Sequence, residues 1–164
     1  MDKLEPIRKK IFESEQLARQ LSVWRFLLQK TVFTNGCFDI LHRGHIEYLA
    51  KAADYGDILI IGLNTDSSAR RLKGPSRPVQ DQNTRALILA SLHFVDAIIL
   101  FDEDTPYKLI EMIQPDILVK GGDYKPEDIA GQDLVKARGG KIITIDLVKG
   151  NSTTGIIKKI VSAK

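Results

Sequence analysis

The chain has 164 residues, of which 43% are hydrophobic and 27% charged, and a formal net charge of +3. This is ordinary for one globular domain with a full core. The single cysteine, Cys37, excludes an intramolecular disulfide and a Cys-cluster zinc site. The small positive charge gives no argument for a nucleic-acid partner and suits a site for anionic small molecules.

Targeting signals are not expected either. No apolar run approaches the ~20 residues that cross a bilayer, which speaks against a membrane partner. Residues 1–10 lack the apolar core of a signal peptide. We therefore expect a soluble protein with a cytoplasmic location.

The apolar pattern predicts one long helix followed by alternating strands and helices. Residues 4–29 read as the long helix, because Ile7, Ile11, Leu21, Trp24 and Leu28 recur at roughly helical spacing. Strands are expected at 31–34, 57–63, 97–101, 116–119 and 141–145. Helices are expected at 45–54, 67–71, 81–92, 105–113, 132–137 and 156–161, with Asp81 and Asp104 as N-caps.

Strands that alternate with helices form βαβ units with right-handed crossovers. We predict an α/β fold: a doubly wound, mostly parallel, five-stranded sheet with an extra N-terminal helix. In such sheets ligands bind beyond the carboxyl ends of the strands. The loops 34–45, 64–78, 120–126 and 146–154 each follow a predicted strand, so we expect them along one rim.

Residues 33–45, Phe-Thr-Asn-Gly-Cys-Phe-Asp-Ile-Leu-His-Arg-Gly-His, carry the strongest functional pattern. His42 and His45 flank a helix start, where unpaired N–H groups favour phosphate. Their spacing lets both rings face one side and donate to a phosphoryl group. A zinc site would need a further ligand, and His93 lies in another predicted helix. Dinucleotide and Walker glycine patterns are absent, so NAD binding and P-loop hydrolysis lose support.

Other segments of this rim carry candidates with plainer alternatives. Residues 70–77 hold four cations that can neutralise a triphosphate, Lys73 foremost, or form a solvated basic surface. Arg85 lies in a first helical turn, against the dipole preference, which favours a functional role. The glycines of segment 120–124 allow backbone groups to face a base or sugar, or simply make a turn. Residues 152–154 are either ordinary N-caps or phosphate ligands.

Together these segments resemble the HxGH nucleotidyltransferase superfamily, and within it the bacterial heptose 1-phosphate adenylyltransferases. The resemblance covers about residues 31–160. It is carried by the segment 33–45, Asn64-Thr-Asp66, Arg71-Leu-Lys-Gly74, Arg77-Pro-Val79, Leu118-Val-Lys-Gly-Gly-Asp-Tyr-Lys-Pro126 and Ser152-Thr-Thr154. It divides the chain into an N-terminal helical extension, 1–30, and a nucleotidyltransferase domain, 31–164.

The resemblance implies transfer of AMP from ATP to D-glycero-D-manno-heptose 1-phosphate, giving ADP-heptose and pyrophosphate for lipopolysaccharide core synthesis. It implies Mg²⁺ accompanying ATP with few protein ligands, a homodimer or larger homo-oligomer, and a separate sugar kinase upstream. His42 and His45 would donate to the α- and β-phosphates. The other implied residues are Lys73 and Arg85 on phosphates, Ser152 and Thr153 on the β- or γ-phosphate, Phe38 and Asp39 along the nucleotide, Gly121 to Asp123 on adenosine, and Gly36 and Asn64 within the nucleotide site.

Two alternatives stay open. Related cytidylyltransferases read Arg-Thr-x-Gly-Ile-Ser-Thr-Thr near the C-terminus, whereas this chain reads Leu147-Val-Lys-Gly-Asn-Ser-Thr-Thr154. The missing Arg weakens a cytidylyltransferase acting on glycerol 3-phosphate or a similar alcohol phosphate. The second alternative is a non-catalytic nucleotide-binding module, against which the intact histidine pair and the loop cations argue.

Overall fold

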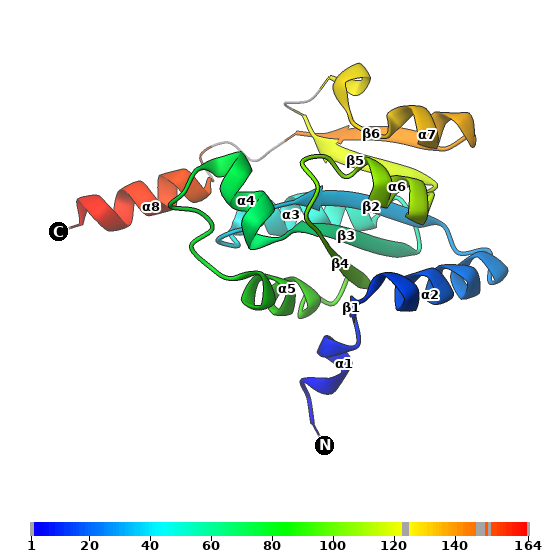
Figure 1. The fold of residues 1–164 in the computed structure, drawn as a ribbon, viewed down its shortest axis with the longest axis horizontal. Coiled ribbons are helices and arrows are strands. Elements are labelled where there is room, and N and C mark those ends of the chain that lie inside the picture. Colours follow the sequence, from blue (N-terminus) through cyan, green and yellow to red (C-terminus); the bar gives the residue numbers. More distant parts are fainter. Residues whose placement is uncertain (1, 123–124, 147–149, 151, 164) are drawn as a thin grey trace.

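The computed structural model describes residues 2–122, 125–146, 150 and 152–163, apart from the side chain of Pro126. Figure 1 shows a sheet flanked by helices, with α8 extending away from it. The elements are α1 (Glu5–Arg8), β1 (Ile11–Phe12), α2 (Ser14–Phe26), β2 (Thr31–Gly36), α3 (Arg43–Ala53), β3 (Ile58–Asn64), α4 (Asp66–Lys73), α5 (Gln82–Ala90), β4 (Ala97–Phe101), α6 (Tyr107–Ile113), β5 (Ile117–Gly121), a 3-10 turn (Pro126–Asp128), α7 (Gln132–Ala137), β6 (Lys141–Ile145) and α8 (Thr153–Ser162).

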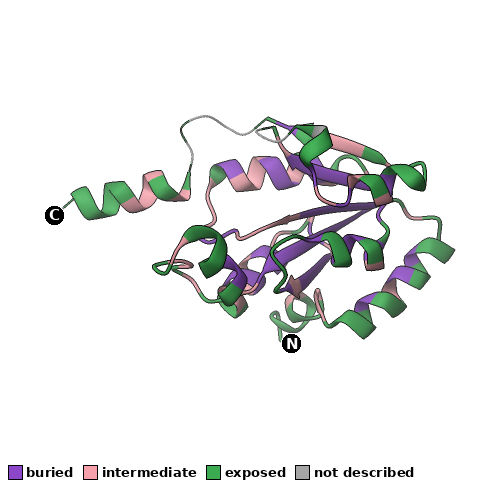
Figure 2. Ribbon diagram, turned by 45° about the horizontal axis from the view of Figure 1, so that its top comes forward, coloured by how far each residue is buried: buried purple, intermediate pink, exposed green. Residues whose placement is uncertain are grey.

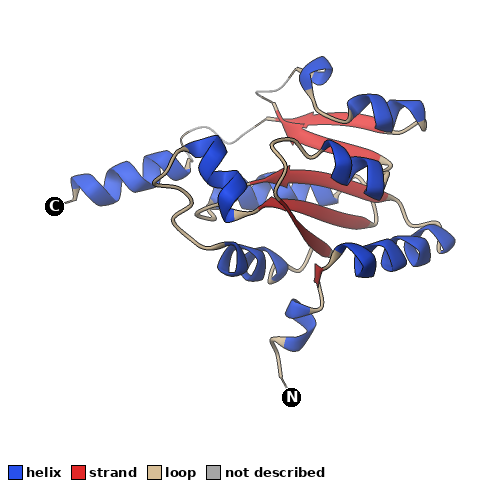
Figure 3. Ribbon diagram, viewed as in Figure 1, coloured by secondary structure: helices blue, strands red, loops and turns tan. Residues whose placement is uncertain are grey.

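The sheet has the strand order β1-β4-β3-β2-β5-β6, and its five strand pairings are all parallel (Figure 3). The predicted doubly wound parallel α/β fold is confirmed, with six strands instead of five. From β2 the chain builds outward through β3 and β4, and then returns to add β5 and β6 on the other side of β2. The strand order therefore reverses between β2 and β5, where such sheets bind ligands.

The single helix predicted for residues 4–29 is wrong. Ile11 and Phe12 form a short edge strand that pairs with Ile98 and Ile99 of β4. A new helix, α2, begins after Glu13, whose side chain accepts from the backbone of Gln16 while the Gln16 side chain accepts from the backbone of Glu13. The pairing stabilises an extended conformation that local helical spacing does not reveal.

Two apolar cores lie on the two faces of the sheet (Figure 2). One packs α3 and α5 against one face, with Leu49 and Leu89 fully buried. The other packs α2, α6 and α7 against the opposite face, around Leu17 and Ile110. Since every strand of the interior contributes to both cores, the sheet is a rigid platform for the loops at its carboxyl edge.

Two expected caps have different outcomes. Asp81 caps α5, because its Oδ1 accepts from the backbone N–H groups of Asn83 and Thr84, as predicted. Asp104 does not cap α6, which begins after Pro106. Its carboxylate instead accepts from Nε of Arg71 at 3.0 Å. Within the described ranges, none of the helices has the length and apolarity needed to cross a membrane.

Candidate active site

The two histidines of the HxGH segment are stacked at the start of α3. His42 is the N-cap, in extended conformation, and His45 lies in the first turn. Their ring centroids are 3.8 Å apart at an interplanar angle of 21°. The backbone N–H of His45 donates to the carbonyl of His42 at 2.9 Å. The predicted arrangement of both rings on one side of a helix start is confirmed.

Burial favours the neutral form of both imidazoles. Burial, and next the neighbouring His42, lower the pKa of His45 from 6.5 to about 4, while a backbone hydrogen bond at Ile40 acts in the opposite direction. Burial also lowers the pKa of His42. The Nδ1 atoms of both rings are buried without a hydrogen-bond partner among the described residues. A neutral imidazole keeps one N–H donor and one acceptor, so each ring has hydrogen-bonding capacity to offer a ligand.

The turn before the histidines is shaped by Gly36 and Phe38. Phe38 has a positive φ of 43° and places a buried ring edge-on to His45, with centroids 5.3 Å apart. A Cβ at Gly36 would lie 3.0 Å from the Phe38 ring, so a larger residue would displace it. These contacts give both residues a packing role behind His45, and their contact with a nucleotide stays a prediction.

Asp39 connects the loop between β2 and α3, residues 37–42, to the segment that follows α4. We call residues 37–42 the histidine loop, because they lead into His42 and His45. Its carboxylate is 3% exposed, and Oδ2 accepts from Nε of Arg77 at 2.6 Å. Oδ1 accepts from the backbone N–H groups of Val79 at 2.8 Å and Gln80 at 3.0 Å. The side chain is therefore engaged by protein donors, which agrees with a nucleotide contact through the backbone alone. That contact stays a prediction.

Arg85 is fully buried and joins three carboxyl-edge segments. Nη1 donates to the carbonyls of Cys37 at 2.6 Å and Asn64 at 2.9 Å. Nε donates to the Gln80 carbonyl at 3.0 Å, and Nη2 donates to Oδ1 of Asp66 at 2.7 Å. Direct binding of phosphate by Arg85 stays a prediction, and these contacts favour a positioning role instead.

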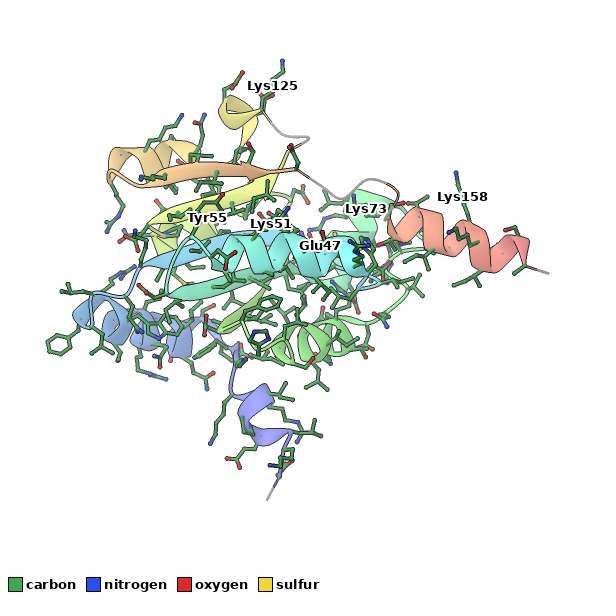
Figure 4. The ribbon with its side chains drawn as sticks, turned by 180° about the vertical axis from the view of Figure 1, so that it is seen from behind. Glu47, Lys51, Tyr55, Lys73, Lys125 and Lys158 are labelled. Carbon is green, nitrogen blue, oxygen red and sulfur yellow. The ribbon has the colours of Figure 1, made fainter. Side chains whose placement is uncertain are left out.

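Lys73 is the cation of the 70–77 segment that is best placed for a ligand. It is exposed, ends α4, and is followed by Gly74 at a φ of 99°. Burial raises the pKa of the half-buried Cys37 thiol, and the positive charge of Lys73 offsets part of this rise. Figure 4 shows Lys73 at the same end of the domain as the N-terminal end of α3, along which Glu47 and Lys51 follow.

The remaining cations of that segment have mixed roles. Arg71 pairs with Asp102 and Asp104, and Arg77 pairs with Asp39. Lys73 makes no ion pair with the described part of the chain. The expected cluster of four mobile cations therefore reduces to Lys73 and Arg70.

The carboxyl ends of β3 and β5 hold other predicted residues. Asn64 is buried, and its Nδ2 donates to Oγ of Ser68 at 2.9 Å. Gly121 ends β5 and pairs with Ile145. Asp123 lies outside the described residues. Beside Gly121, the buried Lys120 donates from Nζ to Oδ1 of Asn35 across the point where the strand order reverses.

The start of α8 reaches the histidine loop. Ser152 caps this helix by accepting from the backbone N–H of Gly155 at 3.0 Å, which confirms its capping role. Oγ1 of Thr153 donates to the carbonyl of Ile40 at 3.5 Å. A second helix N-terminus thus lies beside the loop that leads to His42, and binding of phosphate there stays a prediction.

Sequence reasoning missed the structural role of several residues that organise this site. Arg77, Asp66 and Gln80 hold the rim together through Asp39 and Arg85. Arg77 and Asp66 belong to the quoted motifs, which was the available signal. Across the described residues, no group of three or more His, Cys, Asp or Glu side chains is arranged to hold a metal ion.

The stacked imidazoles lie at a helix start beyond the carboxyl ends of a doubly wound parallel sheet, which is where α/β domains of this class bind their ligands. Residues 33–159 match the Cytidylyltransferase-like family, and the chain belongs to this family. The predicted superfamily is thereby confirmed.

The curated relatives are longer proteins. The chain is 56% identical over 151 residues to the bifunctional protein HldE of Syntrophotalea carbinolica, covering 92% of this chain and 31% of the relative. It is 58% identical over 135 residues to the bifunctional protein HldE of Citrifermentans bemidjiense, covering 82% of this chain and 28% of the relative. The chain spans about a third of the length of these relatives.

Two solved structures share the fold. A lipopolysaccharide core biosynthesis protein from Thermoplasma volcanium is 32% identical, with a TM-score of 0.61, and the match covers 75% of this chain and 99% of that one. A pantoate-beta-alanine ligase from Francisella tularensis is 20% identical, with a TM-score of 0.59, over 93% of this chain and 77% of that one. The second likeness shows the fold alone.

Proposed function

We propose that this domain transfers AMP from ATP to D-glycero-D-manno-heptose 1-phosphate, giving ADP-heptose and pyrophosphate for lipopolysaccharide core synthesis. The observation that carries the proposal is the stacked, neutral pair His42 and His45 at the start of α3. The high identity to bifunctional HldE proteins over most of this chain supports the heptose substrate.

The chemistry of the proposed reaction matches what these residues offer. The attacking sugar phosphate is already an anion, so no general base is required, and a His45 with a pKa of about 4 is a poor base at neutral pH. Catalysis consists of alignment and stabilisation of developing negative charge. His42 and His45 donate to the α- and β-phosphates, Lys73 binds a phosphate, and the N-terminus of α8 at Ser152 and Thr153 receives the β- or γ-phosphate.

The substrate enters as MgATP, because the metal neutralises the triphosphate. The adenosine lies against Gly121 and Gly122, with Gly36, Phe38 and Asp39 along the nucleotide. The proposal further includes a homodimer or larger assembly acting in the cytoplasm and a separate sugar kinase that supplies the heptose 1-phosphate. Sedimentation at micromolar concentration tests the assembly, and an 18.4 kDa species would contradict it.

The substrate assignment is tested by a panel of nucleoside triphosphates against sugar 1-phosphates and alcohol phosphates, with pyrophosphate release as the readout. We expect release with ATP plus heptose 1-phosphate. Release only with CTP plus glycerol 3-phosphate would replace the adenylyl assignment by the cytidylyl alternative. Binding of ATP without release for any acceptor would support the non-catalytic module.

The histidine role is tested by His42→Ala. If His42 acts mainly in the transition state, turnover should fall by roughly 10²–10³-fold, as for the loss of one oxyanion donor. The matched control is His93→Ala, because His93 is exposed and packs edge-on to Phe94 away from the histidine loop. Unchanged turnover in His42→Ala would refute the assigned role.

A further inference from the structure

Two buried, oppositely charged side chains hold the backbone of one rim residue, Gln80, through its N–H and its carbonyl. Oδ1 of Asp39 accepts from the backbone N–H of Gln80 at 3.0 Å, and Nε of Arg85 donates to the backbone carbonyl of the same residue at 3.0 Å. Asp39 is 3% exposed and the Arg85 side chain 0% exposed. Water therefore cannot easily substitute for either contact, and both must be made by the protein.

The same two side chains hold the histidine loop. Asp39 is part of that loop, and Nη1 of Arg85 donates to the Cys37 carbonyl at 2.6 Å. The backbone of Gln80 is thus tied to the turn that carries Phe38 and leads into His42. We refer to Asp39, Arg85 and the backbone of Gln80 as the latch.

Arg85 also holds the other end of the segment that carries Lys73. Its Nη2 donates to Oδ1 of Asp66, the first residue of α4, at 2.7 Å. Residues 66–80 are therefore anchored at both ends by one guanidinium, with Lys73 between the anchors. Charge-assisted hydrogen bonds in a dry environment are the strongest and most directional contacts available for such a fixation.

We propose that Asp39 and Arg85 are positioning residues that set where Lys73 meets the phosphates relative to His42 and His45. This rests on the proposed function, because Lys73 is assigned a phosphate there. The side chains of the latch act through Lys73 and touch no substrate themselves, whereas the contact proposed between Asp39 and the nucleotide is made by its backbone. A misplacement of about 1 Å in such an arrangement is enough to cost roughly 10²-fold in rate.

The proposal is tested by a double-mutant cycle between Arg85→Lys and Lys73→Ala, measured on kcat. Arg85→Lys keeps the charge but loses the fork that reaches several acceptors at once. Alone it should lower kcat by about 10²-fold, and in the Lys73→Ala background by less than about threefold, since the group that it positions is gone. Losses that multiply in the double variant would overturn the proposal.

Matched controls separate positioning from general loss of stability. Arg25 donates from Nη2 to the Ile113 carbonyl at 2.6 Å, away from the rim, so Arg25→Lys removes a similar contact and should leave kcat unchanged. Asp116 accepts from the backbone N–H of Thr31 at 2.7 Å at the opposite end of β2, so Asp116→Asn is the control for Asp39→Asn. If Arg85→Lys does not fold, Asp39→Asn carries the same cycle with the same expected and contradicting results.

The same double-mutant cycle, measured as MgATP affinity by calorimetry, tests the latch independently of the proposed reaction. It needs no turnover, so it remains decisive if no acceptor releases pyrophosphate. Arg85→Lys should weaken MgATP binding in the wild-type background and have less than about a threefold effect in the Lys73→Ala background. Equal weakening of MgATP binding in both backgrounds would overturn the proposed positioning role of the latch, whichever acceptor the domain uses.

Discussion

Lowering the pH from 7 to 5 should destabilise the ligand-free protein through His45. Its pKa falls from 6.5 to about 4 on folding, by burial and then by His42. Between these values the unfolded chain binds a proton that the folded domain excludes. The stabilisation is therefore fully present above pH 6.5 and is lost as the pH falls towards 4. The ceiling is about 1.4 kcal/mol per pH unit. Solvent screens the partly exposed ring, so we expect a loss on the order of 1 kcal/mol at pH 5.

The assay is urea unfolding at pH 7 and pH 5 of the wild type and of His45→Gln, which cannot titrate at this position. The free energy of unfolding should fall between the two pH values by on the order of 1 kcal/mol more in the wild type than in the variant. His93→Gln, at an exposed position, is the matched control and should retain the wild-type pH dependence. Equal pH dependence in the wild type and His45→Gln would refute the reasoning that burial excludes the proton.

Three further outcomes are expected. Gly62→Ala in β3 should lower the free energy of unfolding by about 1–3 kcal/mol, because the added Cβ would lie 2.8 Å from the Phe33 ring and 3.0 Å from Leu109. An unchanged denaturation midpoint would contradict this close packing around Gly62. Leu17→Ala should cost about 2–5 kcal/mol, because Leu17 is fully buried between α2 and the sheet, and a loss of only a few tenths would contradict that packing. Chelation of Mg²⁺ by EDTA should abolish pyrophosphate release and added Mg²⁺ should restore it, whereas full activity in EDTA would exclude MgATP as the substrate form.

The parts of the fold with strong local patterns were predictable. The strands at 97–101 and 141–145 and the helix at 132–137 have the predicted bounds. The stacking of His42 and His45 follows from their spacing across one helical turn. β1 was not predictable, because Ile7 and Ile11 fit a helical pattern and only the edge of β4, more than 80 residues later, makes Ile11 extended.

The direction of charged side chains was less predictable than their presence at the rim. The sequence predicted a functional cation at Arg85, but the carbonyls that accept from it belong to three separate segments, around Cys37, Asn64 and Gln80. No local pattern reports that three carbonyls converge on one guanidinium. Likewise, the partner of Arg77 is a carboxylate 38 residues earlier, so a segment expected to bind a triphosphate or to form a solvated basic surface is partly held by Asp39.

The most direct measurement of the central claim follows the phosphorus atoms of ATP. The protein is incubated with heptose 1-phosphate and ATP labelled at either the α- or the γ-phosphorus, and the sugar product and pyrophosphate are separated. We predict that the α-label enters the sugar nucleotide and the γ-label enters pyrophosphate. Label from the γ-phosphorus in the sugar product, or no label in any sugar product, would contradict AMP transfer by this domain.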